Sequence, residues 1–271
     1  MNFLLATDLD RTLLPNGKEP DEEGSLEKLL SILAVKNMAL TYVTGRNLRL
    51  VKEAMSEFTL ATPDYLISEV GTMVYIWDQN EFKLHPEWLG YLKAKALTWE
   101  RDKLEKIILT NLSGQGVLQE GEFQNDYKIS FYINESDFEI CKTKLAELSI
   151  LTDMDAELIF SFDPLKQAGL LDVLPRVATK VTALEFLRSD LGLSLNEVVY
   201  CGDSGNDVLP LSFGYKAIVV NNAHLDTKKI VKDIVQEKQI SDQVYFASGA
   251  SYGNGNYSSG ILEGLNYFGL I

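Results

Sequence analysis

Short runs of apolar residues recur in the first and last parts of the chain, and each run is followed by polar residues or glycine. Runs of this kind, without polar alternation, are typical of strands buried on both faces. Between them the apolar positions have helical spacing, at about 24–35 and 46–58. Alternating strands and helices predict a parallel sheet. Its strands are expected at residues 3–6, 39–43, 64–67, 198–201 and 217–220.

Two regions depart from this alternation. Residues 87–109 form a long helical stretch, and Lys128 to Ile133 alternates with period two, as in a sheet with one solvent-exposed face. Residues 248–260, rich in Gly, Ser and Asn, predict a mobile loop. We therefore expect an α/β core with a small α+β domain inserted into it. The expected boundaries give a discontinuous core at 1–78 and 167–271 and an inserted domain at 79–166.

Composition narrows the class of protein. The chain has 271 residues, 46% of them apolar, which is enough for a well-buried core. A formal net charge of −14 disfavours nucleic acids and anionic lipids as partners. The N-terminal apolar run is too short for a signal peptide, and no run reaches the roughly 18 apolar residues of a membrane span. With two cysteines, Cys141 and Cys201, and no disulfide framework, we expect a cytoplasmic protein.

The first candidate chemistry follows the first strand. Asp8 and Asp10 are two residues apart, so in an extended chain their side chains leave on the same side and can share one site. A calcium-binding EF-hand loop is excluded, because Leu13 stands where that loop needs glycine. Taken alone, the pair is equally consistent with a solvated turn.

A second acidic group follows the strand at 198–201, in the segment Gly202 to Asp207. Its glycines allow the backbone to approach a ligand, and its carboxylate and amide oxygens are ligands that Mg²⁺ prefers. This segment alone is also consistent with a turn. Because ligands gather at the carboxyl ends of parallel strands, both acidic groups are expected at one edge of the sheet. Several carboxylates gathered there require a cation.

Together these segments resemble the haloacid dehalogenase superfamily of phosphohydrolases. Its four motifs appear in order, as DLDRT at 8–12, VTGR at 43–46 with Thr44, a lysine opening a helix at Lys180, and GDSGND at 202–207. The long gap between Thr44 and Lys180 matches an inserted domain of the type called a C2 cap. The resemblance implies a Rossmann-like core with a parallel sheet and a cap that reads the substrate.

Within that superfamily the chain most resembles the sucrose-phosphate phosphatase group. Besides the four motifs, it carries SEVG at 68–71, YKIS at 127–130 and LP at 174–175. Arg11 stands where the group often has Asn, and Val181 where Gly commonly follows the lysine. These departures leave the chemistry intact and put the identity of the sugar in doubt.

The resemblance assigns roles in phosphoryl transfer, which needs cations because the attacking carboxylate and the phosphoryl group are both anions. Asp8 would be the nucleophile and Asp10 the general acid and then base, while Thr44 would donate a hydrogen bond to a phosphoryl oxygen and Lys180 would neutralise its charge. The implied Mg²⁺ ligands are Asp8, the backbone carbonyl of Asp10, and Asp203, with support from Asn206 and Asp207.

Specificity is expected from the cap. Lys128, Ser130 and Tyr132 alternate onto one strand face and would line a sugar pocket, although polar residues on a strand often only meet solvent. Arg46 is either a phosphate contact or a surface residue at the start of a helix.

The expected function is that of a Mg²⁺-dependent phosphatase. Its substrate would be sucrose-6-phosphate or a similar disaccharide phosphate, hydrolysed through an aspartyl-phosphate, with a sugar-phosphate synthase as a possible partner. The alternatives are a sugar phosphomutase with the same cap type and a non-catalytic phosphosugar-binding module. The first would isomerise a sugar phosphate in the presence of a bisphosphate, and the second predicts gaps in the motif set.

Overall fold

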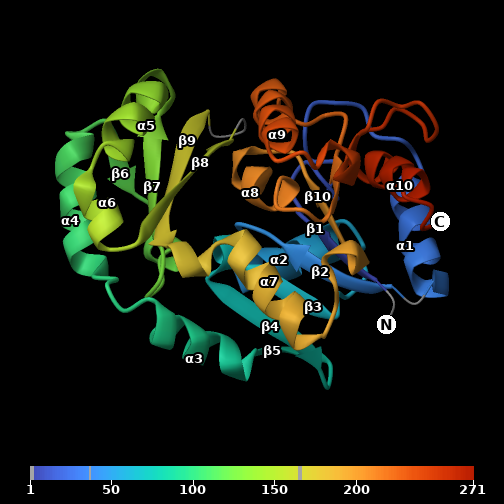
Figure 1. Ribbon diagram of the computed structural model, residues 1–271, viewed down its shortest axis with the longest axis horizontal. Helices are drawn as coiled ribbons and strands as arrows, with labels where there is room; N and C mark the ends of the chain where they lie inside the picture. Colours follow the sequence, from blue (N-terminus) through green and yellow to red (C-terminus); the bar gives the residue numbers. More distant parts are fainter. Residues whose placement is uncertain (1–2, 37, 164–166) are drawn as a thin grey trace.

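The computed structural model describes residues 3–36, 38–163 and 167–271, which form two sheets (Figure 1). The eight strands of the larger sheet, in spatial order, are β12 (Val244–Phe246), β11 (Lys216–Val219), β10 (Val198–Gly202), β1 (Leu4–Thr7), β2 (Ala39–Val43), β3 (Tyr65–Ser68), β4 (Met73–Asp78) and β5 (Glu81–Leu84). This sheet is parallel from β12 to β3, and its last two pairings, β3 with β4 and β4 with β5, are antiparallel, which agrees with the α/β core expected from the sequence.

All five strands predicted for this sheet form, within one residue at each end. The apolar pattern explains them, because every residue of β1, β2 and β10 is buried. Figure 1 shows α1 and α10 on one side of these central strands and α7 and α8 on the other. The helices associated with this sheet are α1 (Ser25–Lys36), α2 (Leu48–Glu57), α3 (Pro86–Lys95), α7 (Lys180–Asp190), α8 (Val208–Leu211), α9 (Leu225–Glu237) and α10 (Tyr257–Tyr267).

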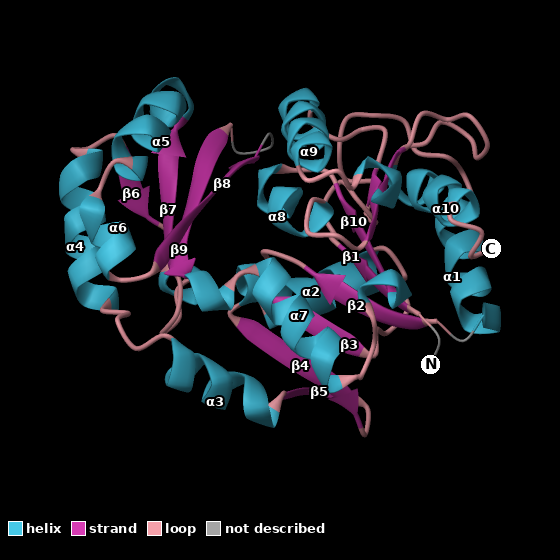
Figure 2. Cartoon of the chain, viewed as in Figure 1, coloured by secondary structure: helices cyan, strands magenta, loops and turns pink. Residues whose placement is uncertain are grey.

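The smaller sheet is entirely antiparallel, and we call it the cap sheet. Figure 2 shows helices on its outer side, while its other side is turned toward the larger sheet. In spatial order its strands are β6 (Gly116–Leu118), β7 (Ile129–Asn134), β9 (Ala168–Pro175) and β8 (Ala156–Asp163), and its helices are α4 (Arg101–Leu112), α5 (Phe138–Ala146) and α6 (Ser149–Asp153).

The sheets divide the chain at slightly different places from the predicted boundaries. β5, at Glu81–Leu84, belongs to the larger sheet although it lies within 79–166. β9, at Ala168–Pro175, belongs to the cap sheet although it lies beyond residue 166. β9 therefore returns the chain from the cap sheet to the core.

Three local expectations are corrected by the structure. The stretch at 87–109 forms two helices, because the helix is interrupted between Lys95 and Arg101. In this interruption the Trp99 indole donates to the Asp126 carbonyl oxygen. The segment 248–260 ends inside α10 and is anchored: the buried carboxylate of Glu263 accepts hydrogen bonds from three successive backbone N–H groups at 248–250. The polar face of β7 is not wet, since Ser130 is fully buried.

Among the helices that the structure describes, none combines the length and the apolar character required to cross a bilayer.

Candidate active site

The two acidic groups lie at the place in the larger sheet where the order of the strands reverses. β1 lies between β10 and β2, so the chain builds outward on one side of β1 and later returns to build on the other. Asp8 follows β1, and Asp203 follows β10. The edge of a parallel sheet at such a switch point is where α/β proteins bind ligands. The sheet order thus brings together carboxylates that lie almost 200 positions apart in sequence.

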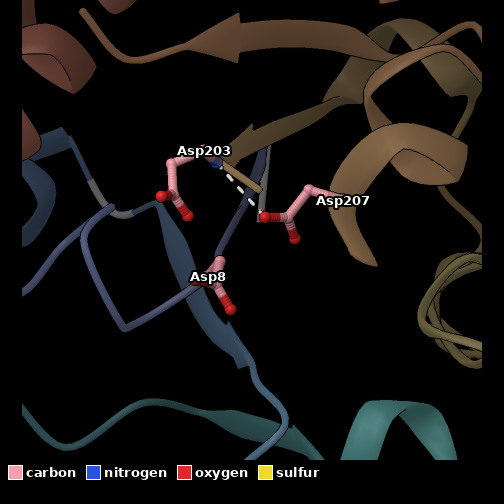
Figure 3. Close-up of side chains that lie close together, drawn as sticks. All are labelled: Asp8, Asp203 and Asp207. Atoms are coloured by element: carbon pink, nitrogen blue, oxygen red, sulfur yellow. Dashed lines mark hydrogen bonds between the residues drawn. The ribbon is translucent and has the colours of Figure 1, made fainter. Parts of the chain in front are cut away.

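Three buried carboxylates converge at this point (Figure 3). One oxygen from each of Asp8, Asp203 and Asp207 lies within 4.8 Å of the others. Burial raises the pKa of Asp8 well above its ordinary value; Lys180 opposes the rise, and the carboxylates of Asp207 and Asp203 add to it. Burial and the neighbouring carboxylates therefore both oppose the ionisation of Asp8.

Asp207 is held by the loop that contains it. Its Oδ2 accepts hydrogen bonds from the backbone N–H groups of Asp203, at 3.2 Å, and Ser204, at 3.1 Å. Its Oδ1 accepts from the Tyr200 hydroxyl at 2.6 Å. Gly202 makes this loop possible, because a Cβ there would lie 2.6 Å from the Cβ of Asp207. Asp207 thus serves as a structural anchor of the site.

Lys180 joins the two acidic groups. Its Nζ donates to Asp8 Oδ1 and Asp207 Oδ1, both at 2.8 Å, and to Asn206 Oδ1 at 3.0 Å. Thr179 caps α7 through a capping box and so fixes Lys180 as the first helical residue. A cation at a helix N-terminus opposes the helix dipole. Burial alone would lower the pKa of Lys180, but Asp207 and Asp8 raise it above its ordinary value.

Two residues of the first motif, DLDRT at 8–12, donate hydrogen bonds to Asp203. Arg11 Nε donates to its Oδ2 at 3.1 Å, and the Thr12 hydroxyl donates to its Oδ1 at 3.3 Å. Burial and the Asp207 carboxylate raise the pKa of Asp203 to about 7, against the opposing effect of Arg11. Arg11, the departure from the family pattern, is therefore part of the site.

Asp10 is more open than Asp8, with a side chain that is 43% exposed. Arg46 donates to both of its oxygens, from Nε at 2.8 Å and from Nη2 at 2.6 Å, and Asn16 Nδ2 adds a third bond at 2.6 Å. Burial would raise the pKa of Asp10, but the bonds from Arg46 and Asn16 lower it below its ordinary value. In this arrangement Arg46 contacts a site carboxylate and is not merely a surface residue.

Thr44 lies at the end of β2, next to this pair, and is fully buried. Its backbone N–H donates to the Ile67 carbonyl oxygen at 2.8 Å, and its Oγ1 accepts from the N–H of Arg46 at 3.1 Å. The second of these bonds uses one lone pair of the Thr44 hydroxyl and leaves its proton for another acceptor.

The donor set fits a hard divalent cation. Mg²⁺ favours carboxylate and carbonyl oxygens, which Asp8, Asp203 and the carbonyl of Asp10 supply. Burial is the main cause of the raised pKa values of Asp8 and Asp203, and the neighbouring carboxylates add to it, so a bound cation would favour the ionised form of both. Asn206 Oδ1 and both oxygens of Asp207 already accept hydrogen bonds, which suits the supporting role predicted for them.

The cap residues predicted to read a sugar lie on the strand face that is turned toward the core. Ile129 and Phe131, on the other face of β7, pack in the core of the cap. Lys128 is only 3% exposed, and among the described residues none accepts a hydrogen bond from its Nζ. The Ser130 hydroxyl donates to Asp172 Oδ1 at 2.5 Å. Ser130 is therefore already paired, and its effect on a substrate would act through Asp172.

Two contacts show that this face meets the core. Val70 of the core forms a small buried apolar cluster with Ile159 of β8 and Leu174 of β9. Gly205, in the loop that holds Asp207, lies so near the cap that a Cβ on it would be 2.6 Å from the Phe160 carbonyl oxygen. The cap sheet thus lies over the acidic cluster.

Sequence reasoning missed several residues of the site. Tyr200 and Asp172 each interrupt a run of apolar residues in a strand. A polar side chain in such a run is a weak indication of a functional residue. Asn16 had no signal beyond its place near the first motif. The contacts of Arg11 and Asp172 join segments that lie far apart in sequence, whereas Tyr200 and its partner Asp207 are only 7 positions apart.

Comparisons with known proteins agree with this geometry. A family model described as sucrose-6F-phosphate phosphohydrolase matches residues 1–269. A putative HAD-like hydrolase of Nitrosococcus oceani is 37% identical, over 98% of this chain and 71% of that protein. A mannosylfructose-phosphate phosphatase of Agrobacterium fabrum is 26% identical, over 98% of this chain and 97% of that protein. The structure of the sucrose-phosphatase of Synechocystis, in complex with sucrose and phosphate, superimposes with a TM-score of 0.76 and 25% identity over 99% of this chain and 98% of that one.

Proposed function

Since the chain belongs to the sucrose-6F-phosphate phosphohydrolase family of haloacid dehalogenase phosphatases, we propose that it hydrolyses a disaccharide phosphate in a Mg²⁺-dependent reaction. The observation that carries this proposal is the triad of buried carboxylates joined to Lys180, beneath a cap face with a buried lysine. Sucrose-6-phosphate is the favoured substrate, and mannosylfructose-phosphate is a related candidate.

Asp8, Asp203 and the backbone carbonyl of Asp10 would hold Mg²⁺. When bound, the ion would reduce the repulsion between the phosphoryl oxygens and the attacking carboxylate. Lys180 contributes a second positive charge at Asp8 itself, at 2.8 Å. The free hydroxyl proton of Thr44 would be donated to a phosphoryl oxygen.

The reaction then proceeds through the carboxylates of this chain. An oxygen of Asp8 attacks phosphorus, and the bond from phosphorus to the sugar oxygen breaks. Asp10 gives its proton to the leaving sugar oxygen and becomes a carboxylate. Asp10 next takes a proton from water, which attacks the aspartyl-phosphate and releases phosphate and Asp8.

Arg46 has a place in this sequence of steps. In the free enzyme its guanidinium keeps Asp10 ionised, because it donates to both carboxylate oxygens. A general acid must carry a proton, so the ion pair has to loosen before the first step. The incoming phosphoryl group is an anion that competes for the same guanidinium. Arg46 would therefore turn from Asp10 to the substrate, which frees Asp10 to take up a proton.

The cap would supply the selectivity. The ammonium group of Lys128 has N–H donors that no described residue accepts, and the hydroxyl oxygens of a sugar could accept them. Asp172, held by Ser130, offers acceptor oxygens to the same sugar. A closed cap also excludes water from the first step.

A screen of phosphate release tests this function. We expect the highest kcat/KM with disaccharide phosphates, a lower value with monosaccharide phosphates, and no turnover after chelation until Mg²⁺ is restored. Equal rates on all sugar phosphates and on an aryl phosphate, or turnover that resists chelation, would contradict the proposal.

The same screen separates the alternatives. A phosphomutase would return the phosphoryl group to a sugar, so isomerisation that depends on a bisphosphate would favour it. Binding of a sugar phosphate without release of phosphate would favour a non-catalytic module. A phosphatase of this class consumes the product of a sugar-phosphate synthase, so we also propose a functional link to such an enzyme, tested by measuring whether a purified synthase co-elutes with this chain.

A further inference from the structure

One cap side chain, that of Asn125, is bonded directly to the core segment between β3 and β4. Its Nδ2 donates to Glu69 Oε2 at 2.7 Å and to the Thr72 hydroxyl oxygen at 2.8 Å. Glu69 and Thr72 are both buried. The contact is therefore partly shielded from solvent, and it includes a charge-assisted hydrogen bond, which is stronger than a neutral one.

The same residue fixes the position of Lys128. The backbone N–H and carbonyl of Asn125 exchange hydrogen bonds with those of Lys128, each at 3.3 Å. Its side-chain Oδ1 accepts from the Tyr127 N–H at 2.8 Å. Asn125 thus stabilises the turn that carries Lys128, while its side-chain amide donates hydrogen bonds to the core.

On the core side, the contact leads back to the phosphate end of the site. The backbone N–H of Glu69 donates to the Arg46 carbonyl oxygen, and that of Val70 donates to the Thr44 carbonyl oxygen, both at 3.0 Å. Glu69 and Val70 have φ of 51° and 64°, a left-handed conformation that is strained for such side chains. Strain of this kind persists where surrounding contacts enforce it, and it concentrates at functional sites.

We propose that Asn125 is a positioning residue that links the two ends of the substrate site. Through Glu69 it holds the cap on the core, and through its backbone it sets Lys128 at a fixed distance from Thr44 and Arg46. This inference rests on the proposed function in one respect, namely that Lys128 contacts the sugar. It assigns to Asn125 no contact with the substrate.

The variant Asn125→Asp tests the link with little change in shape. An aspartate at this position still accepts from the Tyr127 N–H, so the turn is preserved. It loses both donors to the core and places a second carboxylate against Glu69. The double variant Asn125→Asp/Glu69→Gln restores a donor from the other side, because the glutamine amide can donate to the new carboxylate.

The control is another cap-to-core contact. Arg49 of the core pairs with Glu122 of the cap at 2.5 Å, and both side chains are about half exposed. Glu122→Gln weakens this exposed pair, which is expected to contribute little. Glu69→Gln alone keeps an amide oxygen that accepts from Asn125 but loses the charge, so its effect is expected to be smaller than that of Asn125→Asp.

Two measurements are made on each protein in the presence of Mg²⁺. The first is the ratio of kcat/KM on the disaccharide phosphate to that on an aryl phosphate. The second, without substrate, is hydrogen exchange of the peptide that contains Glu69 and Val70. In Asn125→Asp we expect the ratio to fall about 10- to 100-fold and exchange to accelerate, both restored in the double variant and unchanged in Glu122→Gln.

The outcomes are distinguishable. If the wild type has no preference for sugar phosphates, the proposed function fails, and faster exchange in Asn125→Asp with rescue still supports the link between cap and core. If the wild type has the preference and the ratio is unmoved in Asn125→Asp, the positioning role is overturned. A fall that the double variant does not restore, or that Glu122→Gln reproduces, also overturns it.

Discussion

The core site and the cap face differ in how they hold charge. In the core, Lys180 donates to three acceptors, and the Asp10 carboxylate accepts three hydrogen bonds. On the cap, Lys128 is equally buried, yet no described residue accepts from its Nζ. A hydrogen-bonded network of this kind is preorganised for chemistry on the phosphoryl group that all phosphate esters share. A cation with no protein partner gains most from a ligand that brings an acceptor, so Lys128 would favour substrates that carry one.

The largest effect should come from Asp8→Asn. An amide is too weak a nucleophile to attack phosphorus, so kcat/KM should fall by about 10³-fold or more on every phosphate ester. Phosphate release measured on a sugar phosphate and on an aryl phosphate checks this, with thermal unfolding as the control for folding. A variant that retains a tenth of the wild-type rate on either substrate would remove Asp8 from the role of nucleophile.

Asp10→Asn should have the next largest effect, and it should depend on the leaving group. A sugar oxygen leaves poorly without a proton, so we expect a loss of at least about 10²-fold on the sugar phosphate. An activated aryl phosphate needs less help, and its loss should be smaller. The ratio of the two losses is the measurement. Equal losses would mean that Asp10 does not act as the acid.

Lys128→Ala should affect the cap function alone. Loss of a charged hydrogen bond to the sugar should lower kcat/KM on the disaccharide phosphate about 10- to 150-fold and spare a small aryl phosphate. Lys106→Ala is the matched control, because Lys106 is an exposed lysine of α4 in the same cap. If the two variants behave alike, the face of β7 that carries Lys128 does not read the sugar.

The smallest effect on catalysis is expected from a buried carboxylate outside the site. Burial would raise the pKa of Glu263, but hydrogen bonds from Tyr245 and from three backbone N–H groups lower it below its ordinary value. Glu263→Gln should therefore lower the free energy of unfolding by about 1–3 kcal/mol at pH 7 and leave kcat/KM nearly unchanged.

The pH dependence of this variant has a defined sign. A carboxyl with a depressed pKa in the folded state stabilises the protein above its unfolded pKa, and this contribution disappears as the pH falls through the folded value. The stability difference between wild type and Glu263→Gln, measured by urea unfolding, should be constant near neutrality and shrink below about pH 4.5. A difference that grows on acidification would contradict the assignment.

Much of the core could be predicted from local pattern. The buried apolar runs gave five parallel strands because burial on both faces leaves a signal within each run. Among the strands that local pattern did not predict, β4 pairs antiparallel with both of its neighbours, and β9 contains the acid Asp172, which interrupts the apolar pattern. The composition of the segment 248–260 predicts a mobile loop. Its order comes from Glu263, a residue outside the window in which that composition was judged.

The sequence by itself determined which chemical groups this protein has and at which strand ends they lie. The spacing of apolar residues, the turn residues and the motifs can each be recognised within a short stretch of the chain. Only the tertiary structure decided their pairing. Lys180 meets Asp8 across 172 positions, and Asn125 meets Glu69 across 56. Contacts at such separations depend on the order of strands in the sheet and on the seating of the cap, and these follow from packing the whole chain.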